Sequence, residues 1–139
     1  MSSAVSDRAA VLGLGIIGSR AYAKLAEAGL DVVCWNRTPK EVPGACATAA
    51  EAVEHAGIIS LYLKDAPALR EVMESIGDHP HEGSVVLNHS TVDLAATKWL
   101  EQICISRGCH FLDAPFTGSK LAAGEGQLVY YVGGDGNLP

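Results

Sequence analysis

Short apolar runs alternate along this chain with longer stretches in which apolar residues recur at helical spacing. Strand patterns that alternate with helix patterns are typical of a parallel sheet with crossover helices. Runs such as GIISLYL and SVVLN show no in-and-out alternation, as expected for strands that helices cover on both faces. We therefore predict six strands, which span Ala9–Leu12, Asp31–Trp35, Ile58–Leu63, Ser84–Asn88, His110–Leu112 and Leu128–Val132.

Between the predicted strands lie four stretches with a polar side and an apolar side, which is the pattern of helices packed on a sheet. They span Ile17–Ala28, Thr48–His55, Ala66–Ile76 and Leu94–Arg107, and glycines suited to helix ends lie close by at Gly29, Gly57, Gly77 and Gly108. The expected fold is an α/β, Rossmann-type, doubly wound sheet. It is mainly parallel and six-stranded, with helices on both faces and the strand order 3-2-1-4-5-6.

Length and composition fit one globular domain over residues 1–139, of which residues 1–7 are expected to be flexible. Apolar residues make up 48% of the chain and charged residues 19%, which is ordinary for a folded protein. The net charge of -6 argues against nucleic acid and membrane partners, because both attract basic proteins. No apolar run reaches membrane-spanning length, and the N-terminal segment does not fit a signal peptide, so a cytoplasmic protein is expected.

The metal-ligating residue types predict no metal site. The pair His79 and His81 lies in a polar turn without a third ligand nearby in the sequence, which favours a solvated loop over a metal site. The four cysteines form no CxxC pair and are expected to be reduced, buried thiols: Cys34, Cys46, Cys104 and Cys109.

A glycine-rich segment, GLGIIG, follows the first predicted strand and opens the first predicted helix. In a dinucleotide-binding turn, Gly13 would permit the tight turn, Gly15 the approach of a pyrophosphate, and Gly18 the close packing of helix on sheet. Exposed N–H groups and the helix dipole would then attract the phosphates. This context favours cofactor binding over a plain turn, with contacts from Gly13, Leu14, Gly15, Ile16, Ile17 and Gly18.

The end of the second strand indicates which dinucleotide binds. NAD-selective domains carry an acid about 20 residues beyond the glycines, where it binds the ribose 2′-hydroxyl. Here Asn36 is uncharged, Arg37 offers a planar fork to a 2′-phosphate and Thr38 adds a hydroxyl. NADP (NADPH) is therefore favoured over NAD, the alternative being that Arg37 only solvates a turn. Lys40 is a lesser candidate for the same phosphate.

With these pieces placed, the sequence resembles the β-hydroxyacid dehydrogenase family, which includes 3-hydroxyisobutyrate and 6-phosphogluconate dehydrogenases. Three segments support the resemblance: the glycine segment through WNRT, then NHSTVD, then DAPFTGSKLAAGEGQL. The STVD, GSK and GQL motifs are most similar to the glyoxylate and succinic semialdehyde reductase branch, whose members use NADPH. Imine reductases share a similar first half but fit the later motifs less well, and they are kept as a minor alternative.

The resemblance implies that Leu63 lies beside the cofactor and that Thr91 contacts its nicotinamide end. Both residues also lie just past the carboxyl ends of predicted strands, where ligands bind in open α/β sheets. The alternative for Ser90 and Thr91 is a helix N-cap, a role that can coexist with cofactor contact. His89 is expected to pack or to form a hydrogen bond.

The resemblance further implies a substrate-carboxylate site at Thr117, Gly118, Ser119 and Lys120, the alternative being a plain glycine loop. Asp113 either accepts backbone N–H bonds or faces the substrate. Three residues depart from the family pattern. Lys64 replaces the usual proline, which is expected to change the loop after the third strand. Phe116 and Thr117 replace the commoner valine and serine, which is expected to narrow or reshape the substrate pocket.

In this family the catalytic proton donor is a lysine on a helix after the cofactor domain, so we expect it beyond Pro139, together with a C-terminal helical domain. No catalytic residue is assigned within the chain. The full-length protein is expected to be an NADP-dependent reductase, a homo-oligomer that interconverts a small aldehyde or keto acid and a hydroxy acid. The 139 residues alone are expected to bind cofactor with little turnover. The alternative is a non-catalytic NADP-binding sensor or scaffold.

Overall fold

The structure is a computed structural model that describes residues 8–80, 82–114, 116–117, 129–130 and 133–134. Its helices are α1 (Ile16–Glu27), α2 (Ala49–Val53), α3 (Ala66–Ile76) and α4 (Leu94–Ser106). Its strands are β1 (Ala9–Leu12), β2 (Val32–Trp35), β3 (Ile58–Leu61), β4 (Val85–Asn88), β5 (His110–Asp113), β6 (Phe116–Thr117), β7 (Val129–Tyr130) and β8 (Gly133–Gly134). In this part of the chain, no helix has both the length and the apolar character needed to cross a bilayer.

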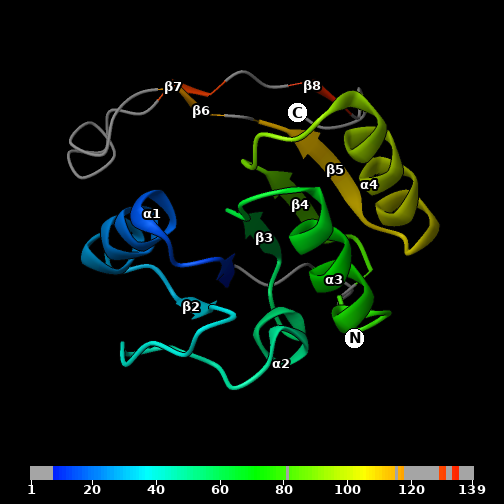
Figure 1. Cartoon of the computed structure of the whole chain (residues 1–139). Coiled ribbons are helices and arrows are strands. Elements are labelled where there is room, and N and C mark those ends of the chain that lie inside the picture. Colours follow the sequence, from blue (N-terminus) through cyan, green and yellow to red (C-terminus); the bar gives the residue numbers. More distant parts are fainter. Residues whose placement is uncertain (1–7, 81, 115, 118–128, 131–132, 135–139) are drawn as a thin grey trace.

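One mainly parallel sheet organises the chain, as predicted (Figure 1). Its order is β2-β1-β3-β4-β5-β8, in which β1 to β5 pair in parallel and β8 runs antiparallel to β5. The sixth strand is not the predicted Leu128–Val132. Within that range, β7 pairs with β6 in a separate two-stranded sheet, and β8 takes the sixth place.

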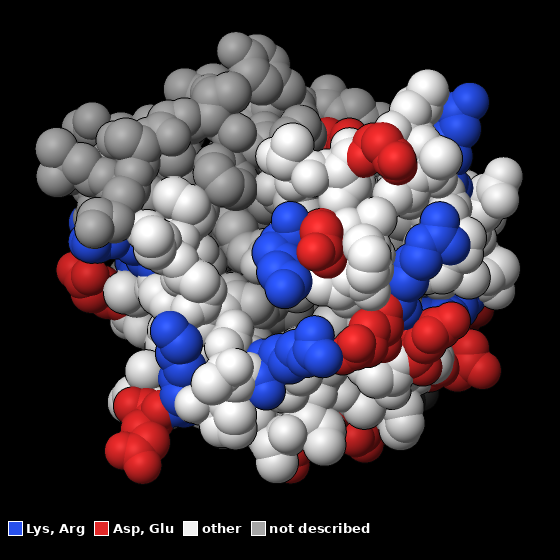
Figure 2. Space-filling view, viewed as in Figure 1, with Lys and Arg blue, Asp and Glu red and all other residues white. Residues whose placement is uncertain are grey.

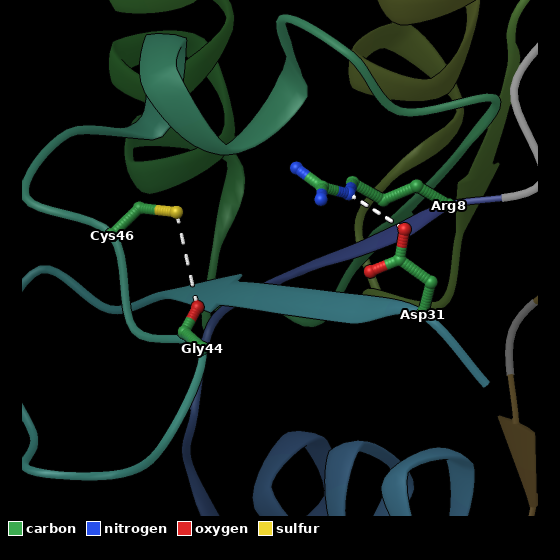
Figure 3. Close-up of polar contacts among 4 residues, drawn as sticks. All are labelled: Arg8, Asp31, Gly44 and Cys46. Atoms are coloured by element: carbon green, nitrogen blue, oxygen red, sulfur yellow. Dashed lines mark hydrogen bonds and ion pairs between the residues drawn. The ribbon is translucent and has the colours of Figure 1, made fainter. Parts of the chain in front are cut away.

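The predicted strand order 3-2-1-4-5-6 is wrong for the six strands as predicted, because β3 pairs with β1 and not with β2. A short segment, Gly44 to Cys46, occupies the outer edge of β2 instead (Figure 3). Cys34 N–H donates to the Gly44 carbonyl at 2.9 Å, and Cys46 N–H donates to the Cys34 carbonyl at 2.8 Å. With that edge taken, the chain crosses over β1 before it forms β3.

Helices cover both faces of the sheet, as predicted. The larger core contains buried side chains of α2, α3 and α4, packed on one face around Leu12, Ile59 and Phe111. The smaller core joins α1 to the other face through Tyr22, Val11 and Cys34, which are all buried. Right-handed crossovers explain this division, because the step from β1 to β2 runs opposite to the later steps across the sheet.

The start of β1 is tied to the residue before β2. Arg8 Nε donates to Asp31 Oδ2 at 3.1 Å (Figure 3), and Ala9 N–H donates to the Asp31 carbonyl at 2.9 Å. Both side chains of the ion pair are substantially exposed, so it adds little stability and the backbone bond fixes the register. Strand β1 also pairs with β2 on one side and with β3 on the other, so the loop at its carboxyl end starts from a fixed position.

Candidate functional site

The carboxyl ends of the parallel strands β2, β1, β3 and β4 lie at the same edge of the sheet. The order of the strands reverses between β1 and β3, because β2 lies on one side of β1 and the later parallel strands lie on the other. Ligands bind at such switch points in open α/β sheets. A cavity of about 280 Å³ lies between the ends of β2 and β3, and we call it the β2-side pocket. Its walls are Gly13, Gly15, Trp35, Asn36, Arg37, Thr38, Tyr62, Leu63, Lys64, Ala68, Glu71 and Val72.

A second cavity of about 290 Å³ lies between the start of α1 and the turn after β4, and we call it the β4-side pocket. Its walls are Gly15, Ile16, Ile17, Gly18, Tyr62, Leu63, Lys64, Ser90 and Thr91. The two pockets share Gly15 and the segment 62–64. Together they form a two-lobed groove that runs across the glycine loop.

The three glycines of the loop have different structural roles. Gly13 has φ +103°, and a Cβ there would collide with the Tyr62 carbonyl oxygen. A Cβ on Gly18 would collide with the Gly13 carbonyl oxygen. Gly15, by contrast, has no neighbouring heavy atom within 4 Å of an added Cβ. Gly13 and Gly18 are therefore needed for packing, while the open side of Gly15 faces the groove.

The N-terminus of α1 differs from those of the other three helices. The side chains of Thr48, Asp65 and Asp93 cap α2, α3 and α4, whereas no side chain caps α1. The first backbone bond of α1 runs from Ser19 N–H to the Gly15 carbonyl at 2.9 Å, so the N–H groups of the preceding turn lie outside that ladder. The positive end of the helix dipole thus lies at the groove, which suits a phosphate.

Asn36 braces the loop after β2. Its Oδ1 accepts from Leu14 N–H at 2.6 Å, and its Nδ2 donates to the Thr38 carbonyl at 2.7 Å. The side chain therefore joins the glycine loop to the neighbouring turn. Arg37 and Thr38 extend from that turn with largely exposed residues, and both line the β2-side pocket.

Ser90 performs the same bracing on the β4 side. Its buried hydroxyl accepts from Leu63 N–H at 2.8 Å and donates to the Leu61 carbonyl at 3.3 Å. Asp93 caps α4 by accepting from Ala96 N–H at 2.8 Å, so the alternative of a cap by Ser90 or Thr91 is wrong. Thr91 is exposed and lines the β4-side pocket.

A buried polar layer supports this wall. His89 Nδ1 lies 2.9 Å from the Ala114 carbonyl, and its ring stacks on Tyr62 with centroids 4.6 Å apart, as expected for a packing and hydrogen-bonding histidine. Burial lowers the pKa of His89, although the bond to Ala114 opposes the shift. Asp113 Oδ1 accepts from Asn88 Nδ2 at 3.1 Å, and burial raises the pKa of this carboxyl more than that bond lowers it.

All the residues predicted to bind cofactor line the groove or its immediate surroundings. Leu14 lines a smaller cavity of about 100 Å³ beside Asn36 and Arg37, where Lys40 also lies. The substrate-loop residues Gly118, Ser119 and Lys120 lie outside the described residues, and only the backbone of Thr117 is described, in β6. Among the described residues, no three His, Cys, Asp or Glu side chains gather as a metal site, and His81 is outside that set.

Sequence reasoning missed one wall of the β2-side pocket, which α3 supplies. Ala68, Glu71 and Val72 all face this pocket. Their spacing, i, i+3 and i+4, is that of one helix face, and this was the available signal. Trp35, Tyr62 and Lys64 were also missed as lining residues.

Comparison with known proteins assigns the family. The family described as the NAD binding domain of 6-phosphogluconate dehydrogenase matches residues 8–138. The chain belongs to this family. Three glycine positions with distinct packing roles, an uncapped α1 and a two-lobed groove are features that fit a dinucleotide in such an NAD-binding domain.

Individual relatives confirm the resemblance to β-hydroxyacid dehydrogenases. The Mycobacterium tuberculosis 3-hydroxyisobutyrate dehydrogenase, solved with L-serine, has a TM-score of 0.88 and 25% identity, covering 95% of this chain and 48% of that one. Glyoxylate/succinic semialdehyde reductase 1 of Arabidopsis thaliana is 29% identical over 134 residues, which are 89% of this chain and 46% of that protein.

A different kind of relative is the cytokine-like nuclear factor N-PAC of Mus musculus. It is 33% identical over 131 residues, which are 91% of this chain and 24% of that protein. The NAD-binding domain described here thus spans between about a quarter and about half the length of these relatives.

The glycine roles predict opposite phenotypes for two alanine variants. Gly18→Ala should lower the free energy of unfolding by about 1–3 kcal/mol, because the new methyl group overpacks against the Gly13 carbonyl. Gly15→Ala should cost at most about 1 kcal/mol but weaken NADPH binding at least about tenfold, because its methyl enters the groove. Chemical denaturation and calorimetric titration measure both effects. Wild-type NADPH affinity in Gly15→Ala would contradict a dinucleotide path across Gly15.

Protonation of His89 should destabilise the fold. Because its folded-state pKa is lowered, the unfolded chain binds more protons as the pH falls below the ordinary histidine value of about 6.5. The free energy of unfolding should therefore fall with pH in this range, by at most about 1.4 kcal/mol per pH unit. Denaturation curves between pH 7.5 and about 5.5 stay above the ordinary titration range of the carboxyl groups, and the raised pKa of Asp113 acts in the opposite direction to that of His89. His89→Asn should flatten the slope, whereas the exposed control His55→Asn should retain it; an unchanged slope in His89→Asn would refute the assignment.

Proposed function

We propose that this domain binds NADP, with the adenosine half in the β2-side pocket and the nicotinamide half in the β4-side pocket. The observation that supports the proposal is the pair of lobes on either side of Gly15, which share a wall at 62–64. The pyrophosphate would cross the start of α1, where backbone N–H groups precede the first helical bond. Leu63 would pack on the cofactor at the centre, and Thr91 would contact the nicotinamide side.

We propose that the β2-side pocket selects the 2′-phosphate. Arg37 would bind this phosphate with its guanidinium fork and Thr38 with its hydroxyl, while Asn36 holds the turn. The turn after β2 contains no carboxylate that would repel the phosphate. Discrimination between NADP and NAD would therefore depend on the exposed side chains of Arg37 and Thr38, on a turn that the Asn36 side chain fixes by hydrogen bonds to the backbone.

The whole protein is proposed to be a cytoplasmic homo-oligomeric reductase that interconverts a small aldehyde or keto acid and a hydroxy acid. NADPH, when bound, supplies the hydride, and this domain holds and orients it. Thr117, Gly118, Ser119 and Lys120 would bind the substrate carboxylate, and the proton donor would be a lysine outside these 139 residues. The named activities of the dehydrogenase and reductase relatives support this proposal. Imine reduction stays a minor alternative.

A non-catalytic NADP-binding module is the second candidate. Several N-PAC proteins, which are named as nuclear factors and not as reductases, match this chain at 31–33% identity. Such a module would use the same groove for binding without a completed catalytic site. The two candidates therefore share their cofactor chemistry and differ in turnover.

Removal of Arg37 tests the cofactor preference. Arg37→Ala should weaken NADPH binding about tenfold or more, because a charge-assisted phosphate contact is lost, and should leave NADH affinity within about twofold. Arg20→Ala, which removes the same charge from exposed α1 outside both pockets, is the matched control. Calorimetric titration at one ionic strength gives both dissociation constants. Equal NADH and NADPH affinity in the wild type, or an unchanged NADPH affinity in Arg37→Ala, would refute this role.

Turnover by the full-length protein separates the two candidate functions. The reductase should consume NADPH with glyoxylate or succinic semialdehyde. Ser119→Ala should raise the KM for the aldehyde about tenfold while the Kd for NADPH stays constant, because it removes one hydrogen bond to a charged substrate. NADPH binding without turnover on either aldehyde would instead support the non-catalytic module.

A further inference from the structure

The β2-side pocket contains an acid that lies far from the turn after β2 in sequence. Glu71 projects from α3 and its Oε1 lies 3.6 Å from Arg37 Nε. Both residues line the pocket, and the side chain of Glu71 is 57% exposed and that of Arg37 69% exposed. Figure 2 shows that basic and acidic side chains lie against one another at several places on this face. Arg37, the residue proposed to bind the 2′-phosphate, thus already has an anionic partner in the protein.

The ion pair has opposite consequences for the two cofactors. A 2′-phosphate must either share the Arg37 guanidinium with Glu71 or displace Glu71 from it. The Glu71 carboxylate also repels the negative charge of the phosphate. An unphosphorylated ribose brings no such charge, and a carboxylate is the group that commonly accepts its 2′-hydroxyl. Among the charged residues that line this pocket, Arg37 and Lys64 favour a phosphate and Glu71 opposes it.

We propose that Glu71 is a specificity-determining residue that competes with the 2′-phosphate for Arg37 and so limits the preference for NADPH over NADH. The inference rests on the proposed NADP binding and adds a residue that acts against it. Exposed ion pairs contribute a few tenths of a kcal/mol up to about 1 kcal/mol, so removing the competitor is expected to change affinity about two- to fivefold. The wild-type domain would therefore prefer NADPH over NADH by a smaller factor than it would with an unpaired Arg37.

Glu71→Gln tests the proposal, because it removes the charge and keeps the size and a hydrogen-bond acceptor. We expect NADPH binding to tighten about two- to fivefold at low ionic strength, with NADH affinity unchanged or lower. Glu74→Gln removes the same charge from the same helix at an exposed position outside the pocket lining, and both affinities should stay at wild-type values. In an Arg37→Ala background, Glu71→Gln should no longer improve NADPH binding.

Three results would overturn the proposal: an equal change for both cofactors, weaker NADPH binding in Glu71→Gln, or an undiminished gain without Arg37. Thermal unfolding of each variant confirms that the fold is intact. If the wild-type protein binds neither NADPH nor NADH, the proposed function fails as well. If the wild type binds NADPH and Glu71→Gln leaves the NADPH-to-NADH ratio unchanged, only the role of Glu71 fails.

Discussion

The contact between Gly18 and the Gly13 carbonyl determines how the rest of the site is built. Any Cβ at Gly18 would strike that oxygen, and any Cβ at Gly13 would strike the Tyr62 carbonyl. Absence of both side chains allows α1 to begin close to the ends of β1 and β3. The N-terminus of the helix is then directed into the crevice, where Gly15 leaves open space. Close packing at Gly13 and Gly18 thus leaves Gly15 on the open side of the loop, where it faces the groove.

The loops at the strand ends contain residues that fix the backbone and, next to them, residues that face the ligand site. Asn36 and Ser90 each use their side chains to join neighbouring loops by hydrogen bonds, and they fix the two walls of the groove. The residues next to them, Arg37 and Thr91, are exposed to the pockets. A rigid frame with exposed neighbours lets specificity change without loss of the fold. Relatives named as dehydrogenases, reductases and nuclear factors all match this one domain, so the fold alone does not select among these functions.

Sequence patterns predicted most helices and strands well, because the residues that start and end such an element lie within it or directly beside it. Helix α3 begins and ends at the predicted residues, where Asp65 caps its start and Gly77 adopts a positive φ at its end. The segment at Gly44 to Cys46 was missed because a single bridge beside β2 has no periodicity, and its omission led to the wrong strand order. Glu71 was missed because an exposed acid on a helix looks like ordinary surface. Its meaning depends on a contact with Arg37 that only the folded chain creates.

The most direct test is the backbone amide NMR spectrum of the domain during titration with NADPH and, separately, with 2′,5′-ADP. We expect NADPH to shift the resonances of Gly15 to Ile17, of Asn36 to Thr38, and of Ser90 and Thr91 together. The adenosine fragment should shift those at Asn36 to Thr38 and leave Ser90 and Thr91 unchanged. Unperturbed resonances in all three segments at saturating NADPH, or shifts confined to another face, would contradict the two-lobed dinucleotide site.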